Sequence, residues 1–296
     1  MFYNKPKIEL ELIRNCNFNC SYCGAKSPKE KILKEMDFNY LKYFLKKLKN
    51  TKDIFIILSG GEPTLYSKFI NLFEECQKNN LKNIILITNF SNFNILKEII
   101  NYQPIIIFSI HLNYLNFYWK NINLINNLLQ KFKTVQLQLV LNEFNQNDFK
   151  KLILLKKIIT KIYNPNFFIH YQFISYGNTP NDWPYLNFKN INDWRNFLKI
   201  NPKPIFYLNK TKDTTEFYYQ NLKNYLKNNF EFKTCLNNNF KLLYNFDFVY
   251  ECTDIKKIFN FKKNPKFNIK KLFYKKINCF CEYCDFQICG YCDKNI

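Results

Sequence analysis

Three cysteines stand close together near the start of the chain, in the run Cys16-Asn17-Phe18-Asn19-Cys20-Ser21-Tyr22-Cys23. The spacing allows one loop to bring three thiolates to a single metal centre. Three protein ligands are one fewer than a closed structural site requires, so one coordination position stays open to a small molecule. The run therefore predicts a reactive metal centre, and a zinc loop or three unrelated thiols are the alternatives.

A second segment with the means to bind a ligand is Gly60-Gly61-Glu62-Pro63. It follows the apolar run 54–59, and the cysteines follow the alternating run 7–13, so each motif comes directly after a predicted strand. The chain has only five glycines and two of them are adjacent here, which indicates backbone freedom or a close approach that a side chain would prevent. The Glu62 carboxylate can bind an ammonium group through charge-assisted hydrogen bonds.

The two motifs, in this order, resemble those of the radical SAM superfamily. In that family three cysteines hold a [4Fe–4S] cluster, whose fourth iron binds S-adenosylmethionine, and a GGEP segment binds the methionine end of this cofactor. The resemblance implies that Cys16, Cys20 and Cys23 hold the cluster. It also implies an enzyme that cleaves S-adenosylmethionine reductively to a 5′-deoxyadenosyl radical, which abstracts hydrogen from a substrate.

The same resemblance implies a set of cofactor-binding residues, each at or near the end of a predicted strand or in one of the two motifs. They are Tyr22, Gly60, Gly61, Glu62, Asn89, Ser109 and Asn142. The polar residues that follow strands could instead simply end those strands.

Predicted strands and helices alternate through the first half of the chain. The strands lie near 7–13, 54–59, 83–88, 104–110, 134–141 and 166–173, and the helical stretches near 38–50, 68–79, 92–101, 122–132 and 147–163. This alternation predicts an α/β fold with a parallel sheet and right-handed crossovers. Six such units match the partial (β/α)6 TIM-like barrel that the resemblance implies, and the alternation alone would also suit a doubly wound sheet.

Active-site groups of parallel α/β barrels lie at the carboxyl ends of the strands. Asn89 follows the third strand, where many relatives have Thr-Asn-Gly and this chain has Phe90 in place of the glycine. The only two histidines, His111 and His170, fall at the end of the fourth strand and within the sixth. Either could accept a proton after hydrogen abstraction, and each could instead be a hydrogen-bonded, partly buried imidazole.

Seven of the eleven cysteines fall near the end of the chain: Cys235, Cys252, Cys279, Cys281, Cys284, Cys289 and Cys292. This stretch is similar to a SPASM or Twitch domain, which implies one or two auxiliary [4Fe–4S] clusters, and a four-cysteine zinc site is the alternative. Asp247 stands where that family has glycine, and Asp tolerates a left-handed backbone better than most residues. Cys76, inside a predicted helix, is expected to be a small buried hydrophobe.

These patterns divide the chain into three parts. They predict a radical SAM partial barrel over 1–176, a proline-containing connecting segment over 177–232, and a small cysteine-rich SPASM- or Twitch-like domain over 233–296. The short stretch before Cys16 shows no separate peptide-recognition domain, which argues slightly against capture of a long leader peptide.

The composition restricts the partners of the protein. The formal net charge is +21, yet Arg14 and Arg195 are the only arginines, whereas nucleic-acid readers favour the planar guanidinium fork. A lysine-coated surface that attracts an acidic peptide, or a low-potential electron donor such as flavodoxin or ferredoxin, fits this composition better than nucleic acid. No apolar run is long enough for a membrane span and no secretory signal is present, so we expect a cytoplasmic enzyme.

Three functions remain open at this stage. The first is a radical SAM enzyme that modifies a peptide or protein side chain, as SPASM relatives often do. The second is a radical oxidase or dehydrogenase of a small molecule, such as a sugar or an alcohol. The third, from another class, is a zinc-stabilised nucleic-acid-binding protein without catalytic activity.

Overall fold

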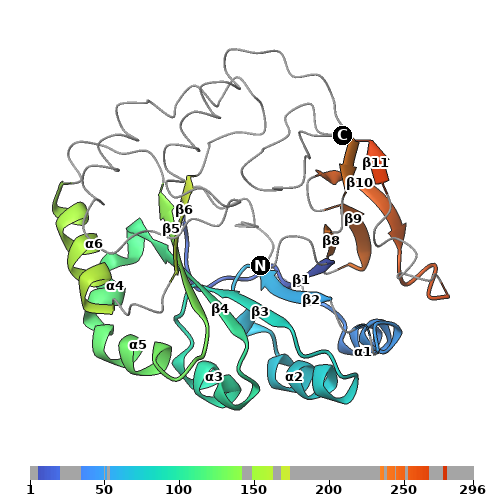
Figure 1. Cartoon of the computed structure of the whole chain (residues 1–296), viewed down its shortest axis with the longest axis horizontal. Coiled ribbons are helices and arrows are strands. Elements are labelled where there is room, and N and C mark those ends of the chain that lie inside the picture. The colour runs from blue at the N-terminus through green and yellow to red at the C-terminus, as the bar shows by residue number, and fades with distance from the viewer. Residues whose placement is uncertain are drawn as a thin grey trace, which may run out of the picture. The chain divides into compact units, whose positions relative to one another are not determined.

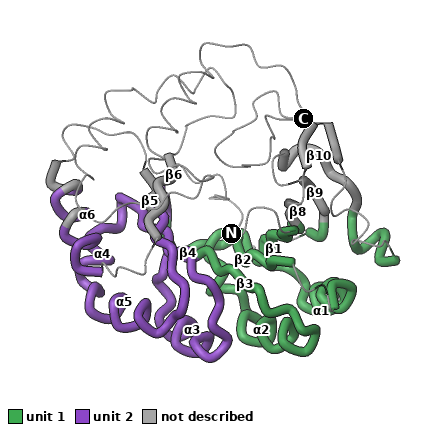
Figure 2. Tube along the Cα trace, viewed as in Figure 1, with its two compact units in different colours: residues 1–18, 25–87, 225–296 green, residues 19–24, 88–224 purple. Residues whose placement is uncertain are grey.

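The computed structural model describes residues 6–20, 35–49, 51, 54–141, 149–162, 168–173, 234–236, 239–243, 245–250, 253–266 and 276–278. The chain forms two compact units, which Figure 2 shows in different colours. Unit 1 contains residues 1–18, 25–87 and 225–296, and unit 2 contains residues 19–24 and 88–224. The cysteine run is therefore divided, with Cys16 in unit 1 and Cys20 in unit 2.

Strands alternate with helices along the described part of the chain (Figure 1). As far as the end of the third strand the elements are β1 (Lys7–Ile13), α1 (Phe38–Lys47), β2 (Phe55–Gly60), the 3-10 helix η1 (Pro63–Leu65), α2 (Phe69–Lys78) and β3 (Ile84–Thr88). Then follow α3 (Phe93–Glu98), η2 (Ile99–Tyr102), β4 (Ile105–His111), η3 (Leu112–Tyr114), α4 (Leu115–Lys120), α5 (Ile122–Leu129), β5 (Val135–Leu141), α6 (Phe149–Ile162) and β6 (Phe168–Phe173). The α/β alternation predicted from the sequence is confirmed.

Neighbouring strands of this series pair in parallel within each unit. In unit 1, β1 pairs with β2 and β2 pairs with β3, and in unit 2, β4 pairs with β5 and β5 pairs with β6. Parallel pairing of consecutive strands requires a crossover between them, and the intervening helices supply it. The carboxyl ends of the strands in each unit therefore lie at the same edge, where the predicted site residues follow.

The burial pattern of β1 explains why this sequence forms the strand. Ile8, Leu10 and Leu12 are fully buried on one face, whereas Lys7 and Glu9 on the other face are partly exposed. This is the period-two alternation that the sequence shows.

Helix α1 follows from an equally local signal. The Asp37 carboxylate accepts hydrogen bonds from the backbone N–H groups of Asn39 and Tyr40, at 2.9 and 3.2 Å, and so caps the helix. Leu41 and Phe44, three positions apart, are both fully buried, so that the helix places an apolar face against the core.

Several predicted helices extend a few residues beyond the observed ones, and two regions differ in kind. The stretch 92–101 contains α3 followed by the 3-10 turns of η2, and α4 was not predicted at all. Helix α4 is six residues long and buries only Leu115 and Tyr118, so it offers one repeat of the helical spacing. A single repeat does not distinguish a helix from a loop.

The last part of the chain adds short strands. They are β7 (Thr234–Leu236), β8 (Asn239–Leu242), β9 (Asp247–Tyr250), β10 (Thr253–Asn260) and β11 (Lys276–Asn278). Strand β8 pairs in parallel with β1, β9 and β10 continue that sheet antiparallel, and β7 pairs with β11. The division of the chain at 176 and 232 stays a prediction, because the connecting segment lies outside the described residues.

An aromatic contact joins α1 to the turn regions beside β9 and β10. The Phe44 and Phe261 rings meet edge to face, with centroids 5.1 Å apart, and the Tyr40 and Phe246 rings lie 5.6 Å apart. Phe261 and Phe246 are fully buried, so residues near the end of the chain share the core of unit 1.

The turn before β9 differs from the expectation at Asp247. The left-handed residue is Phe246, with φ of 66°, whereas Asp247 already belongs to the extended strand. The Phe246 N–H donates to Leu243 O at 2.8 Å, which closes the turn one residue earlier than expected. The glycine-like role assigned to Asp247 is therefore wrong.

None of the described helices has the length and apolar character needed to cross a bilayer.

Candidate functional site

The backbone after β2 lies directly against the root of the cysteine loop. The Gly61 N–H donates to Ile13 O at 2.7 Å, and the Glu62 N–H donates to Asn15 O at 2.8 Å. A Cβ at Gly60 would collide with the backbone of Ile13, and a Cβ at Gly61 would collide with Asn15 O. This is the close approach that the paired glycines predict, and it fixes the residue immediately before Cys16.

Glu62 is the side chain that this turn orients. It is fully buried, and its Oε1 accepts hydrogen bonds from the Thr64 backbone N–H at 3.2 Å and from the Thr64 hydroxyl at 2.6 Å. Glu62 is the N-cap of η1, and Pro63 occupies the first position of that helix. The carboxylate is therefore held in one orientation before any ligand binds. Thr64 was not predicted to take part, although Pro63 at the first helical position marks Glu62 as the N-cap, whose side chain accepts from the N–H two positions later.

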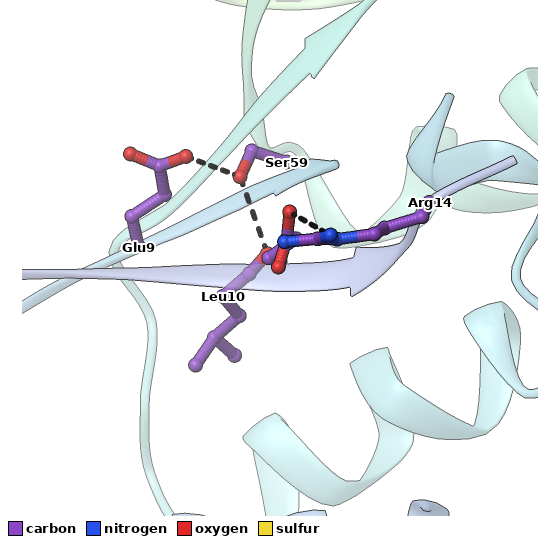
Figure 3. Close-up of polar contacts among 5 residues, drawn as sticks. Glu9, Leu10, Arg14 and Ser59 are labelled. Atoms are coloured by element: carbon purple, nitrogen blue, oxygen red, sulfur yellow. Dashed lines mark hydrogen bonds and ion pairs between the residues drawn. The ribbon is translucent and has the colours of Figure 1, made fainter. Parts of the chain in front are cut away.

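A second set of polar contacts lies on β1 and β2. Figure 3 shows the Ser59 hydroxyl donating to Glu9 Oε1, at 2.5 Å, with Leu10 O at 3.4 Å from the same hydroxyl. Arg14 Nε donates to Glu11 Oε1 at 3.3 Å, and Glu11 is only 7% exposed. Sequence reasoning did not assign these residues, although two acids at alternate positions of an apolar strand already mark a polar face.

The Cys20 end of the loop is contacted by the segment that ends β4. Cys20 is buried, and its Sγ lies 3.7 Å from Nδ1 of His111. The Asn19 backbone N–H donates to the Tyr114 hydroxyl oxygen. Burial lowers the pKa of His111 to about 4, so the imidazole is neutral near pH 7. Tyr114 was missed because the contact joins residues 95 positions apart, which no local pattern reveals.

Asn89 forms a compact turn after β3. Its Oδ1 accepts from the Ser91 N–H at 3.0 Å and from the Ser91 hydroxyl at 2.5 Å, and the residue is 4% exposed. Phe90 has φ of 60°, the left-handed conformation that glycine usually provides. The Phe90 N–H donates to the Thr88 hydroxyl at 3.0 Å. Ser109 is also buried, and its backbone oxygen accepts from the Tyr118 hydroxyl at 3.2 Å.

Many of the predicted site residues lie outside the described residues. These are Tyr22, Cys23, Asn142, Cys252, Cys279, Cys281, Cys284, Cys289 and Cys292. His170 in β6 and Cys235 in β7 are placed by backbone alone. Cys16 is partly buried, and its Sγ accepts from the Phe18 N–H at 3.3 Å.

The metal-ligand assignments stay predictions. Within the described ranges no three His, Cys, Asp or Glu side chains form a group that could hold a metal ion, and the third predicted ligand, Cys23, is not among those ranges. Cys76 is fully buried in α2, and burial, followed by the nearby Glu75 charge, raises the pKa of its thiol to about 12. The expectation that Cys76 is a small buried hydrophobe is confirmed.

The fold of this chain is shared with solved structures of low sequence identity. SuiB of Streptococcus suis, bound to precursor peptide SuiA, is 14% identical with a TM-score of 0.55 over 92% of this chain and 65% of that chain. The structure of anSMEcpe with bound AdoMet is 18% identical, with a TM-score of 0.58 over 97% and 89% of the two chains. The structure of anSMEcpe with bound AdoMet and Cp18Cys peptide has a TM-score of 0.57, at the same identity and coverage.

This chain therefore spans about two thirds of the length of SuiB. No curated protein matches the sequence. The model of the Radical SAM superfamily matches residues 10–155, a range that contains the cysteine run and the turns after β2, β3 and β4. Residues 10–155 of this chain are thus similar to the radical SAM domain, in sequence pattern and in fold.

Proposed function

We propose that this protein is a radical SAM enzyme in which Cys16, Cys20 and Cys23 hold the cluster, and that it abstracts hydrogen from a peptide or protein side chain. The main support is the pair of backbone hydrogen bonds from Gly61 and Glu62 to the residues just before Cys16. They tie the segment proposed to bind the cofactor to the root of the loop proposed to hold the cluster. A plain strand-to-helix turn would not need this contact.

The described residues fit the proposed cofactors in their chemistry. Iron–sulfur clusters take thiolate ligands, and the Cys20 sulfur is already withdrawn from water. Glu62 is a fully buried carboxylate, and Thr64 orients it through two hydrogen bonds to its Oε1. An ammonium group is the charge that such a carboxylate binds best. Together the bound cluster and S-adenosylmethionine would supply the radical chemistry, and the protein would supply orientation and exclusion of water.

A peptide substrate is supported by the similar structures and by charge. SuiB was solved with precursor peptide SuiA and anSMEcpe with the Cp18Cys peptide, and this chain shares their fold. The net charge of +21 favours a substrate peptide with acidic residues and an acidic low-potential electron donor such as flavodoxin or ferredoxin. Rates of electron delivery should then fall as ionic strength rises.

The C-terminal cysteines are proposed to hold one or two auxiliary [4Fe–4S] clusters. The support is the sequence pattern of the seven cysteines from Cys235 to Cys292. Changing Cys281 or Cys284 to Ala should lower the iron content per chain while part of the S-adenosylmethionine cleavage remains. Unchanged iron content in both variants would contradict the proposal.

Anaerobic reconstitution tests the cluster assignment. Iron and sulfide are counted per chain, and 5′-deoxyadenosine is measured after reduction with dithionite. Cys16→Ala, Cys20→Ala and Cys23→Ala should each abolish 5′-deoxyadenosine formation, whereas Cys76→Ala, a buried thiol on α2, should retain it. Formation retained in any of the first three, or wild-type protein that holds zinc without iron, would refute the assignment.

Isotope transfer tests the substrate class. Peptides with deuterated side chains and deuterated sugars or alcohols are offered separately to the reconstituted enzyme. A peptide substrate should transfer deuterium into 5′-deoxyadenosine, because the abstracted atom stays on that product. Transfer from a sugar or alcohol, with none from any peptide, would replace the proposed substrate class with the small-molecule alternative.

A further inference from the structure

The 3-10 turn after β4 contacts two consecutive residues of the cysteine loop. His111 lies against Cys20, with Nδ1 and Sγ 3.7 Å apart, and the Tyr114 hydroxyl accepts from the Asn19 backbone N–H. All four residues belong to unit 2. His111 is the last residue of β4 and the N-cap of η3, and Tyr114 is the last residue of η3. The junction of β4 and η3 therefore presents both side chains to the loop.

The chemistry of a metal-bound thiolate fixes the direction of the His111 contact. A thiolate sulfur offers only lone pairs, so the ring nitrogen that faces it must carry a hydrogen. This holds whether the imidazole is neutral or protonated. A distance of 3.7 Å suits an N–H···S hydrogen bond, because sulfur is larger than oxygen. In the neutral ring the remaining lone pair is then on Nε2.

We propose that His111 donates a hydrogen bond from Nδ1 to the iron-bound thiolate of Cys20 and thereby raises the reduction potential of the cluster. The proposal rests on the proposed function, since it requires a cluster at Cys20. Reduction adds one negative charge to the cluster and its sulfur ligands. An N–H dipole directed at a ligand sulfur stabilises the reduced form more than the oxidised form, which makes the cluster easier to reduce.

Tyr114 has a different role in the same turn. Its hydroxyl accepts from the Asn19 backbone N–H, so this contact is with the backbone of the loop. Tyr114 is therefore assigned as a residue that holds the loop in place, and His111 as the residue that acts on the electronic state of the cluster. The two roles can be separated, because only the second should change a reduction potential.

Substitutions at His111 distinguish a hydrogen bond from simple packing. His111→Leu removes the donor and keeps a side chain of similar reach. His111→Asn keeps an N–H at the position of Nδ1, whereas His111→Gln moves it to the position of Nε2. Tyr114→Phe is the matched control, since it removes a hydroxyl from the same turn without touching the sulfur contact.

The measurement is the midpoint potential of the cluster in the full-length, anaerobically reconstituted protein. A redox titration is followed by the electron paramagnetic resonance signal of the reduced cluster, with iron and sulfide counted in parallel. The signal of the cluster with the open iron is recognised because it alone changes when S-adenosylmethionine is added. No substrate is needed, so the readout is independent of turnover.

We expect His111→Leu and His111→Gln to hold wild-type amounts of iron and to show a lower midpoint potential. A tenfold change in the one-electron equilibrium corresponds to a shift of about 59 mV. His111→Asn should restore most of the wild-type potential, and Tyr114→Phe should leave the potential unchanged.

Two results would overturn the proposal while the proposed function stands. One is a wild-type potential in a fully loaded His111→Leu or His111→Gln protein. The other is a lowered potential in a fully loaded His111→Asn protein, because this variant keeps the N–H donor. This second result decides the question if His111→Leu and His111→Gln do not fold. If wild-type protein assembles no cluster whose signal responds to S-adenosylmethionine, the proposed function itself fails.

Discussion

The turns after β2 and β3 share two features of local geometry but build them from different residues. Each turn contains a residue with positive φ, which is 132° at Gly60 and 60° at Phe90. Each turn also contains a side-chain oxygen that accepts from the backbone N–H two positions later. Thr64 donates to Glu62, and Ser91 donates to Asn89. One turn keeps glycine, and the other places a large aromatic residue where glycine is expected.

The difference lies in what surrounds the Cβ position. At Gly60 a Cβ would collide with the backbone of Ile13, and φ of 132° is outside the region that L-residues adopt. At Phe90, φ falls in the left-handed helical region, which costs an L-residue roughly 1–2 kcal/mol. The Phe90 ring is fully buried and lies 4.9 Å from the Phe108 ring, and this burial offsets the backbone strain. A close backbone approach requires glycine, whereas positive φ alone does not.

The largest effect is expected from Phe90→Ala. Loss of a buried phenyl ring costs about 3–5 kcal/mol in the free energy of unfolding, because the neighbours cannot fill the cavity. Phe90→Gly should cost less than Phe90→Ala, since glycine relieves the left-handed strain that Ala retains. Denaturant unfolding at equilibrium measures both. Phe93→Ala, at a partly buried ring in the same region, is the control and should lose less stability. If glycine and alanine at position 90 were equally destabilising, the left-handed backbone at Phe90 would carry no measurable strain.

Gly60→Ala is expected to come next. The strained φ contributes roughly 1–3 kcal/mol, and displacement of the Ile13 backbone adds to it as an overpacked contact does. The displaced strand end leads into Cys16, so iron content after reconstitution should fall together with the thermal midpoint. Lys68→Ala, at an exposed residue of the same segment, should change neither. Wild-type stability in Gly60→Ala would contradict the assignment of a backbone contact at this position.

Glu62→Gln tests the negative charge that the turn after β2 has and the turn after β3, with Asn89, lacks. The substitution keeps the oxygen that Thr64 contacts and removes the negative charge proposed to bind the ammonium of S-adenosylmethionine. A hydrogen bond to a charged group is worth about 1.5–3 kcal/mol, so the dissociation constant should rise by one to two orders of magnitude while stability changes little. Anaerobic calorimetry with S-adenosylmethionine measures this, with the exposed Glu74→Gln as control. Equal affinity in Glu62→Gln and wild type would remove Glu62 from the proposed cofactor site.

The smallest effect is expected from Asn89→Ala. It removes two neutral hydrogen bonds with Ser91, each worth about 1 kcal/mol. Ser91→Ala removes only one of them and should lose about half as much stability in denaturant unfolding. If both substitutions cost the same, the hydroxyl of Ser91 rather than its backbone N–H makes the contact that matters. A large loss of S-adenosylmethionine affinity in Asn89→Ala would show that this turn also binds the cofactor, as its sequence position predicts.

Local sequence patterns were sufficient for the order of the elements. All six predicted strands are present, and the apolar alternation of β1 and the helical spacing of α1 reappear as buried faces. The paired glycines also indicated their close backbone approach correctly. Such patterns predict the structure well because side-chain periodicity and backbone freedom depend on only a few neighbouring residues. The exceptions are the short helix α4 and the turn at Phe246, where six residues or fewer carry too little pattern.

The contacts that build the site could not be predicted from local sequence patterns. The sequence by itself determined that a three-cysteine loop and a Gly-Gly-Glu-Pro turn each follow a strand, because local spacing encodes both. Only the tertiary structure decided that Glu62 is buried and held by Thr64, and that β8 pairs with β1. It also decided that Cys20 lies against His111, 91 positions away along the chain. Such pairings depend on how separate elements pack, and packing is set by the whole core and not by any single segment.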